Sequence, residues 1–125
     1  MILADTSIWI DHFRSGDNEL IKIIAEDLLL CHPAIIGELA LGSLRDRTNV
    51  LAFLNVQREA QVATHDEVMT MIEKHCIFSK GIGSTDAQLL ASVLPDRRTS
   101  LWTRDKRLKV TAEKAGARLY EPLHN

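Results

Sequence analysis

Short apolar runs alternate with helix-type patterns along this chain, and this alternation limits the possible folds more than any other feature. Residues 1–4, 28–31 and 100–103 are short runs rich in apolar residues, which is typical of buried strands. The longer segments between them carry apolar residues at the three- and four-residue spacing of helices. Strands that alternate with helices predict an α/β sandwich around a mostly parallel central sheet.

The punctuation residues give approximate bounds for these elements. Thr6 and Ser7 are candidate caps of the first helix, Pro33 fits the first turn of a later one, Ser84 is a candidate cap, and Gly116 is placed to end the last helix. Further short strands are expected at 61–63 and 118–120. The expected helices cover about residues 8–13, 18–26, 33–42, 49–55, 65–78, 85–94 and 106–115.

Length and composition favour one globular unit. A chain of 125 residues, 46% hydrophobic and 26% charged, can bury a core but is short for two ordinary domains, so residues 1–125 are expected to form a single domain. No apolar run approaches the roughly 20 residues that span a bilayer. The first residues lack a signal-peptide pattern, so no membrane association is expected and a cytoplasmic location is the default.

The two cysteines, Cys31 and Cys76, both stand in apolar contexts and are predicted to be reduced, buried thiols. Each has a histidine neighbour, His32 or His75, but neighbours in sequence point in different directions. A zinc site built from these pairs is therefore disfavoured.

Basic residues are concentrated near the end of the chain. The formal net charge is −2, yet residues 97–118 contain eight Lys or Arg against two acids, Asp105 and Glu113. Such an excess could attract phosphate groups, or it could simply form a solvated helix face. The sequence leaves both interpretations open.

Four acidic residues are placed to meet at one edge of the sheet. Asp5 and Asp105 directly follow predicted strands, and the carboxyl ends of parallel strands share one edge. Glu38 and Asp86 lie near the starts of helices that open on the same edge. Carboxylates gathered there would repel one another unless a cation lies between them, and hard ions such as Mg²⁺ or Mn²⁺ suit an all-oxygen site. Such an ion can bind a phosphodiester oxygen and activate water, which predicts phosphodiester hydrolysis.

Each acid also has a purely structural interpretation. Asp5, Asp86 and Asp105 could cap helices or favour their positive amino ends. Glu38 is harder to explain in this way because it stands among apolar residues, although its side chain could still face solvent. The residue types alone do not decide between these interpretations.

Four motifs in order resemble the PIN-domain toxins of bacterial type II toxin–antitoxin systems, the VapC family. They are Met1–His12, His32–Leu39, Gly81–Ala91 and Leu101–Leu108, and they span nearly the whole chain. The resemblance implies a PIN-like three-layer α/β/α sandwich and an endoribonuclease that depends on Mg²⁺ or Mn²⁺. It also implies a VapB-type antitoxin as partner, a homodimer, and an RNA substrate.

The resemblance also assigns roles to the acids. Asp5 and Asp86 would be direct metal ligands, Asp105 would bind directly or through water, and Glu38 would bind a second ion or position the attacking water. Thr103 stands where the family often has a hydroxyl that supports the site.

Several other side chains are candidates for smaller roles. Thr6 could donate a hydrogen bond to a neighbouring acid or serve only as a cap. Arg14, Arg104 and Lys106 could contact RNA phosphate or an antitoxin, or could be ordinary surface residues. Ser84-Thr85 departs from the bulkier residue of many relatives, which leaves the substrate contacts open.

Other functions compete with the toxin interpretation. A PIN nuclease that is not a toxin would share every feature above. A phosphatase of the haloacid dehalogenase type would need a second aspartate where Ser7 stands, and a receiver-like signalling domain would need adjacent acids before its first helix. Another metal-dependent phosphate-binding domain remains the broader alternative.

Overall fold

Three short parallel strands form the central sheet. The computed structural model describes residues 1–123, and its sheet has the order β2–β1–β3, with β1 at Ile2–Ala4, β2 at Leu29–Leu30 and β3 at Ser100–Trp102. Ile2 lies opposite Leu29 on one side and Ser100 on the other, and both pairings are parallel. All three strands therefore end at the same edge of the sheet, as the sequence pattern predicts.

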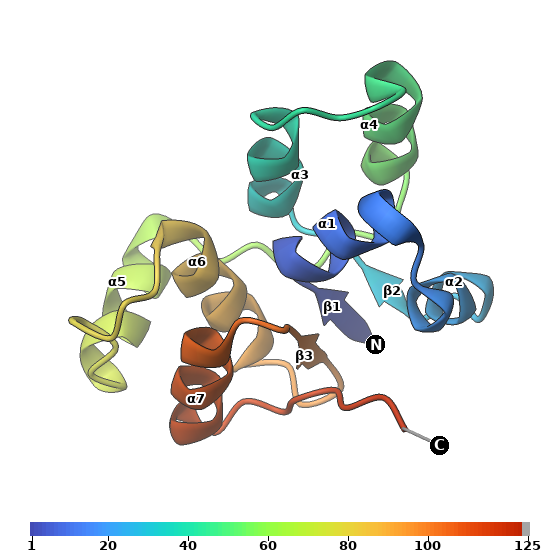
Figure 1. Cartoon of the computed structure of the whole chain (residues 1–125). Helices are drawn as coiled ribbons and strands as arrows, with labels where there is room; N and C mark the ends of the chain where they lie inside the picture. Colours follow the sequence, from blue (N-terminus) through green and yellow to red (C-terminus); the bar gives the residue numbers. More distant parts are fainter. Residues whose placement is uncertain (124–125) are drawn as a thin grey trace.

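Helices flank this sheet on both sides. Figure 1 shows α5, α6 and α7 on the side of β3 and α2 beside β2, whereas α1, α3 and α4 stand above the strands in this view. This arrangement confirms the predicted α/β/α class. No helix in the described part of the chain is long and apolar enough to cross a membrane. The helices are α1 Thr6–Ser15, α2 Asn18–Ala25, α3 Pro33–Ala40, α4 Arg47–Asn55, α5 His65–Lys74, α6 Ser84–Val93 and α7 Lys106–Ala115.

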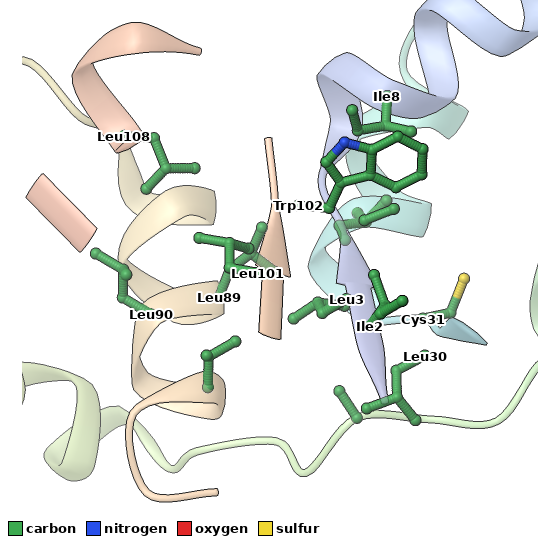
Figure 2. Packing of buried hydrophobic residues seen from close by; sticks show 14 of the residues in the cluster. Ile2, Leu3, Ile8, Leu30, Cys31, Leu89, Leu90, Leu101, Trp102 and Leu108 are labelled. Carbon is green, nitrogen blue, oxygen red and sulfur yellow. The ribbon is translucent and has the colours of Figure 1, made fainter. Parts of the chain in front are cut away.

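The core fills the space between the sheet and its helices. Leu3, Leu89 and Leu101 are fully buried, and Figure 2 shows them gathered between α6 and the strands. Full burial of one such side chain contributes about 2 kcal/mol relative to exposure, so this packing fixes where α6 begins relative to the strand ends. Trp9 and Trp102 are buried as well and form part of this core.

Two helices begin one or two residues earlier than expected. Asp5, rather than Thr6 or Ser7, caps α1 because its side chain accepts a hydrogen bond from the N–H of Ile8. Gly83, rather than Ser84, precedes α6, and no side chain caps that helix. The predicted end of α7 is correct, since Gly116 adopts a φ of 90° there.

The expected strand at 61–63 is wrong. The parallel bridge in this region joins Cys31 to Glu59, two residues earlier, and Ala60 is buried beside it. The expected strand at 118–120 is reduced to a single bridge between Leu101 and Leu119. Each segment is joined to the rest of the sheet by two backbone hydrogen bonds to a single residue, which is Cys31 for the first segment and Leu101 for the second.

The expected helix over 65–78 ends at Lys74 because the chain turns sharply at Cys76, where φ is 52°. The turn sends Ile77 into the core and leaves Cys76 exposed. The prediction of two buried thiols is therefore correct for Cys31 and wrong for Cys76. Both cysteines are free.

Candidate active site

Asp5 lies just past the end of β1 and is almost fully buried. Its Oδ1 accepts hydrogen bonds from the hydroxyl of Ser7 and the N–H of Ile8, and its Oδ2 accepts one from the hydroxyl of Thr103. Burial raises the pKa of Asp5, and these hydrogen bonds oppose the rise. Each carboxylate oxygen can accept about two hydrogen bonds, so Oδ2 keeps one lone pair for a further partner.

Thr103 connects Asp5 to Asp105. Its hydroxyl donates to Asp5 and accepts the N–H of Asp105 at 3.0 Å. Asp105 then caps α7, because its Oδ1 accepts the N–H groups of Arg107 and Leu108 at 2.9 and 3.1 Å. The other oxygen of Asp105 has no hydrogen-bond partner within the described residues, and this side chain is exposed. The predicted supporting role of Thr103 therefore has a geometric basis.

The pKa of Asp86 responds to its burial and to the charges of the other acids at the site. It is the third residue of α6, partly buried, and its pKa is raised to about 6. Burial is the largest cause of this rise, and a hydrogen bond from the N–H of Gly83 opposes it. The negative charges of three other carboxylates add to the rise; they belong to Asp5, Asp105 and Glu38.

These charges act on one another because all four acids lie at the same edge of the sheet. Glu38 comes from α3, which contacts both α1 and α6, and its side chain is exposed. The structure thus brings together the four acids that the sequence singled out, which we call the acid cluster: Asp5, Glu38, Asp86 and Asp105. Asp5 is its most buried member, and Asp86 is intermediate.

The acid cluster fits a hard divalent cation in chemistry and in charge. All four donors are carboxylates, and their mutual repulsion would be relieved by a cation placed among them. Among residues 1–123, no three His, Cys, Asp or Glu side chains already stand close enough together to form a complete coordination group. The ligands are gathered, but the coordination shell is not preassembled.

Comparisons with known proteins agree with this geometry. The sequence profile described as "PIN domain" matches residues 2–114. The chain belongs to the PIN-domain family. Over 121 residues it is 44% identical to "Ribonuclease VapC32" of Mycobacterium tuberculosis, in strain H37Rv and in strain CDC 1551 alike. The match covers 97% of this chain and 98% of each relative, which places this PIN domain in the VapC family.

One side chain that supports the site in this PIN domain, Ser7, was not predicted from the sequence to do so. Ser7 donates to Asp5, and its hydroxyl oxygen accepts the N–H of Arg104 at 3.0 Å. Thr6, the hydroxyl proposed for this task, is buried at its oxygen and has no hydrogen-bond partner within the described residues. Of the two roles left open for Thr6, a hydrogen bond to an acid and a helix cap, the structure shows neither, because Ser7 donates to Asp5 and Asp5 caps the helix.

Arg104 is bound within the protein itself. Its guanidinium forms ion pairs with Asp11, at 2.8 Å, and with Asp17, and it lies 5.5 Å from the ring centroid of Trp102. Two carboxylates compensate its charge, so Arg104 is poorly placed to attract an external phosphate.

Arg14 and Lys106 lie in two separate grooves. Arg14 is exposed and lines a groove of about 730 Å³ between α1 and α3, together with Glu38 and Thr6. Lys106 is exposed at the start of α7 and lines a different groove. The structure does not combine the three basic candidates into one site.

Proposed function

We propose that this PIN domain is an endoribonuclease that hydrolyses RNA phosphodiester bonds with the help of Mg²⁺ or Mn²⁺. The observation that carries the proposal is the placement of four carboxylates at one edge of the sheet, where the charges of Asp5, Asp105 and Glu38 add to the rise that burial causes in the pKa of partly buried Asp86. Natural proteins hold like charges together at a cost, and a shared cation is the usual reason. The similarity to proteins named Ribonuclease VapC32 supports the same activity.

The chain's own residues divide the work. Asp5, Asp86 and Asp105 would hold the ion, with Asp5 offering the free lone pair of Oδ2. Glu38, whose side chain is exposed, would bind a second ion or hold the attacking water. A divalent ion bound there supplies a nucleophile at neutral pH and stabilises the leaving oxygen.

Ser7 and Thr103 act as positioning residues. Their hydroxyls fix both oxygens of Asp5, and Thr103 also fixes the backbone of Asp105. Acids held in this way lose little conformational freedom when an ion binds, which favours both affinity and rate. Asp86 must be ionised to take part, and burial with the neighbouring carboxylates raises its pKa in the absence of metal, so protons compete with the cation and we expect metal binding and activity to weaken as the pH falls.

We further propose that this activity is that of a toxin paired with a VapB-type antitoxin, and that the chain forms a homodimer. The VapC name of the relatives supports the pairing with an antitoxin, whereas the homodimer rests on the resemblance to the toxin family alone. A PIN nuclease without an antitoxin is the alternative. Arrest of growth on expression, and its relief by co-expression of a small gene beside this one, would favour the toxin; expression without any effect on growth would favour the alternative.

Cleavage of RNA by the purified protein tests the enzymatic proposal. We expect cleavage of a structured RNA in Mg²⁺ or Mn²⁺, none in EDTA, and none by Asp86→Asn. Asp66→Asn is a matched control, since Asp66 also lies in the first turn of its helix but is exposed and outside the acid cluster. Full cleavage in EDTA, or by Asp86→Asn, would contradict the metal-dependent mechanism.

A further inference from the structure

A second groove lies beside the acid cluster and carries mostly positive charge. It has a volume of about 420 Å³ and runs between α7 and the segment that follows α5. No Asp or Glu lines it. Its basic side chains define what we call the basic groove: Lys80, Lys106, Arg107 and Lys114.

The regular spacing of α7 builds one wall of this groove. Lys106, Val110 and Lys114 follow one another at four-residue steps, so they share a face of the helix. The distance from first to last along the axis is about 12 Å at about 1.5 Å per residue. Lys80 faces them from the loop before α6. Lys106 and Lys114 at the ends of this line, with Lys80 opposite them, match a few consecutive phosphates.

The charges of the basic groove are not compensated within the protein. Lys109, on another face of α7, pairs with Glu121 at 3.3 Å, and Arg104 pairs with two aspartates. Within residues 1–123 the four basic side chains of the groove form no ion pair. Their field is therefore directed towards solvent and available to a ligand.

The basic groove adjoins the segment that contains Asp105 and the loop that leads to Asp86. Lys106 directly follows Asp105 in the chain. The side chain of Arg107 lies across Gly81, where an added Cβ would stand 3.0 Å from its Cδ, and Gly81 belongs to the loop that leads to Asp86. A ligand in the groove would thus reach the acid cluster at its Asp86–Asp105 side.

The acid cluster itself repels nucleic acid, because four carboxylates face an incoming phosphodiester. Attraction for the substrate must come from cations outside the cluster, and the formal net charge of −2 supplies none over the chain as a whole. The basic groove is a concentrated source of such attraction next to the acids.

We propose that the basic groove binds the sugar–phosphate backbone of a single-stranded RNA segment that flanks the scissile bond. The inference rests on the proposed nuclease function. A single strand suits the site because the groove is small for a double helix, while Val110 offers apolar surface and the ring of His75 a flat one for ribose or base. The backbone contacts position the substrate without reading its sequence.

Binding of a fluorescein-labelled, 12-nucleotide single-stranded RNA of mixed sequence tests the proposal, measured by anisotropy in EDTA so that cleavage does not interfere. The test variant carries Lys→Gln at positions 80, 106 and 114. Arg107 is left intact because it packs on the Gly81 loop. The control variant carries Lys→Gln at positions 22, 74 and 109, which changes the net charge equally but leaves the groove unaltered.

We expect the test variant to bind about tenfold more weakly at low salt. Its slope of log affinity against log salt should fall by about 2, at about 0.7 per lost phosphate contact. The control should stay within about twofold of the unchanged protein. An equal loss of RNA affinity in both variants, or no loss in the test variant, would overturn the proposal that the basic groove binds RNA. Stronger competition by a poly-glutamate peptide than by unlabelled RNA would also overturn it, in favour of an acidic protein segment.

Two further measurements keep the outcomes separate. Thermal unfolding checks that both variants fold; if the triple variant fails, Lys114→Gln and Lys109→Gln repeat the comparison within one helix. Cleavage by the unchanged protein in Mg²⁺ tests the enzymatic proposal independently. If the unchanged protein cleaves RNA and the test variant binds RNA as tightly as the unchanged protein, only the proposal for the basic groove is rejected. If binding depends on the basic groove but the unchanged protein does not cleave RNA, the nuclease proposal is rejected and the groove proposal stands.

Discussion

Replacing Asp86 by asparagine removes a carboxylate that the folded protein ionises only at a cost, and we expect the metal-free protein to become more stable at neutral pH. The pKa of this carboxyl should be near 3.8 in the unfolded chain, and the folded structure raises it to about 6. The folded state therefore holds the proton more tightly. Stability from this group is fully present below about pH 4 and is lost as the pH rises through about 6.

The size of the effect follows from the shift. A rise from 3.8 to about 6 corresponds to about 3 kcal/mol at about 1.4 kcal/mol per pKa unit. Because the side chain is partly open to water, screening reduces the cost to about 1–2 kcal/mol. Asparagine keeps an oxygen that can accept the N–H of Gly83, so the helix start is preserved. For a chain of this size we expect a melting temperature higher by roughly 4–8 °C.

Thermal unfolding in EDTA, followed by circular dichroism at about pH 7.5 and about pH 4, measures this difference. The gain should be full at the higher pH and absent at the lower one, and Asp66→Asn should change little at either. Adding Mg²⁺ should then stabilise the unchanged protein more than the variant, since only the former keeps the full set of ligands. A variant no more stable than the unchanged protein at pH 7.5, or equally stabilised at pH 4, would refute the electrostatic reasoning.

Three other perturbations test neighbouring features. Thr103→Val keeps the side-chain shape but removes a buried hydroxyl, and urea unfolding should show a loss of about 1–3 kcal/mol, with kcat reduced more than KM is raised. Burial alone would raise the pKa of Asp17, but the hydrogen bond and charge of Arg104, together with backbone hydrogen bonds that include the N–H of Leu20, outweigh it and hold that pKa below its usual value. Arg104→Gln should therefore cost about 0.5–1 kcal/mol at pH 7 and less once the pH falls through the lowered pKa of Asp17; an equal loss above and below that pKa would contradict the ion pair. A thiol reagent should modify exposed Cys76 rapidly and Cys31, whose pKa burial raises to about 11, only on unfolding; two fast thiols per chain would show that Cys31 is accessible.

The features that the sequence predicts correctly are those set by strong periodic patterns. The runs at 1–4 and 100–103 are apolar because their strands are buried, so the acids that follow them fall at one edge of a parallel sheet. The convergence of Asp5 and Asp105 could be predicted for that reason. Asp86 required the resemblance to the family, because an acid near a helix start is equally explained by the helix dipole. Glu38 required it because its side chain could equally face solvent.

The features that the sequence does not predict depend on local rotation and on tertiary pairing. Thr6 and Ser7 are adjacent hydroxyls, and only the direction of the first turn of α1 decides which one reaches Asp5. The bridge at Glu59 instead of a strand at 61–63 depends on where Cys31 finds a partner. Likewise, the basic run at the end of the chain does not reveal which cations are compensated, since the partners Asp11 and Asp17 lie far away in sequence.

The double role of Asp5 affects how such a gene can decay. Asp5 both belongs to the acid cluster and starts α1, so a substitution that removes its oxygens loses three hydrogen bonds, including a helix cap worth about 1 kcal/mol. At Asp86, loss of the charge relieves repulsion instead. Under selection against a harmful activity, silenced copies that still fold should therefore accumulate at position 86, whereas changes at position 5 should be found among copies that also fail to fold.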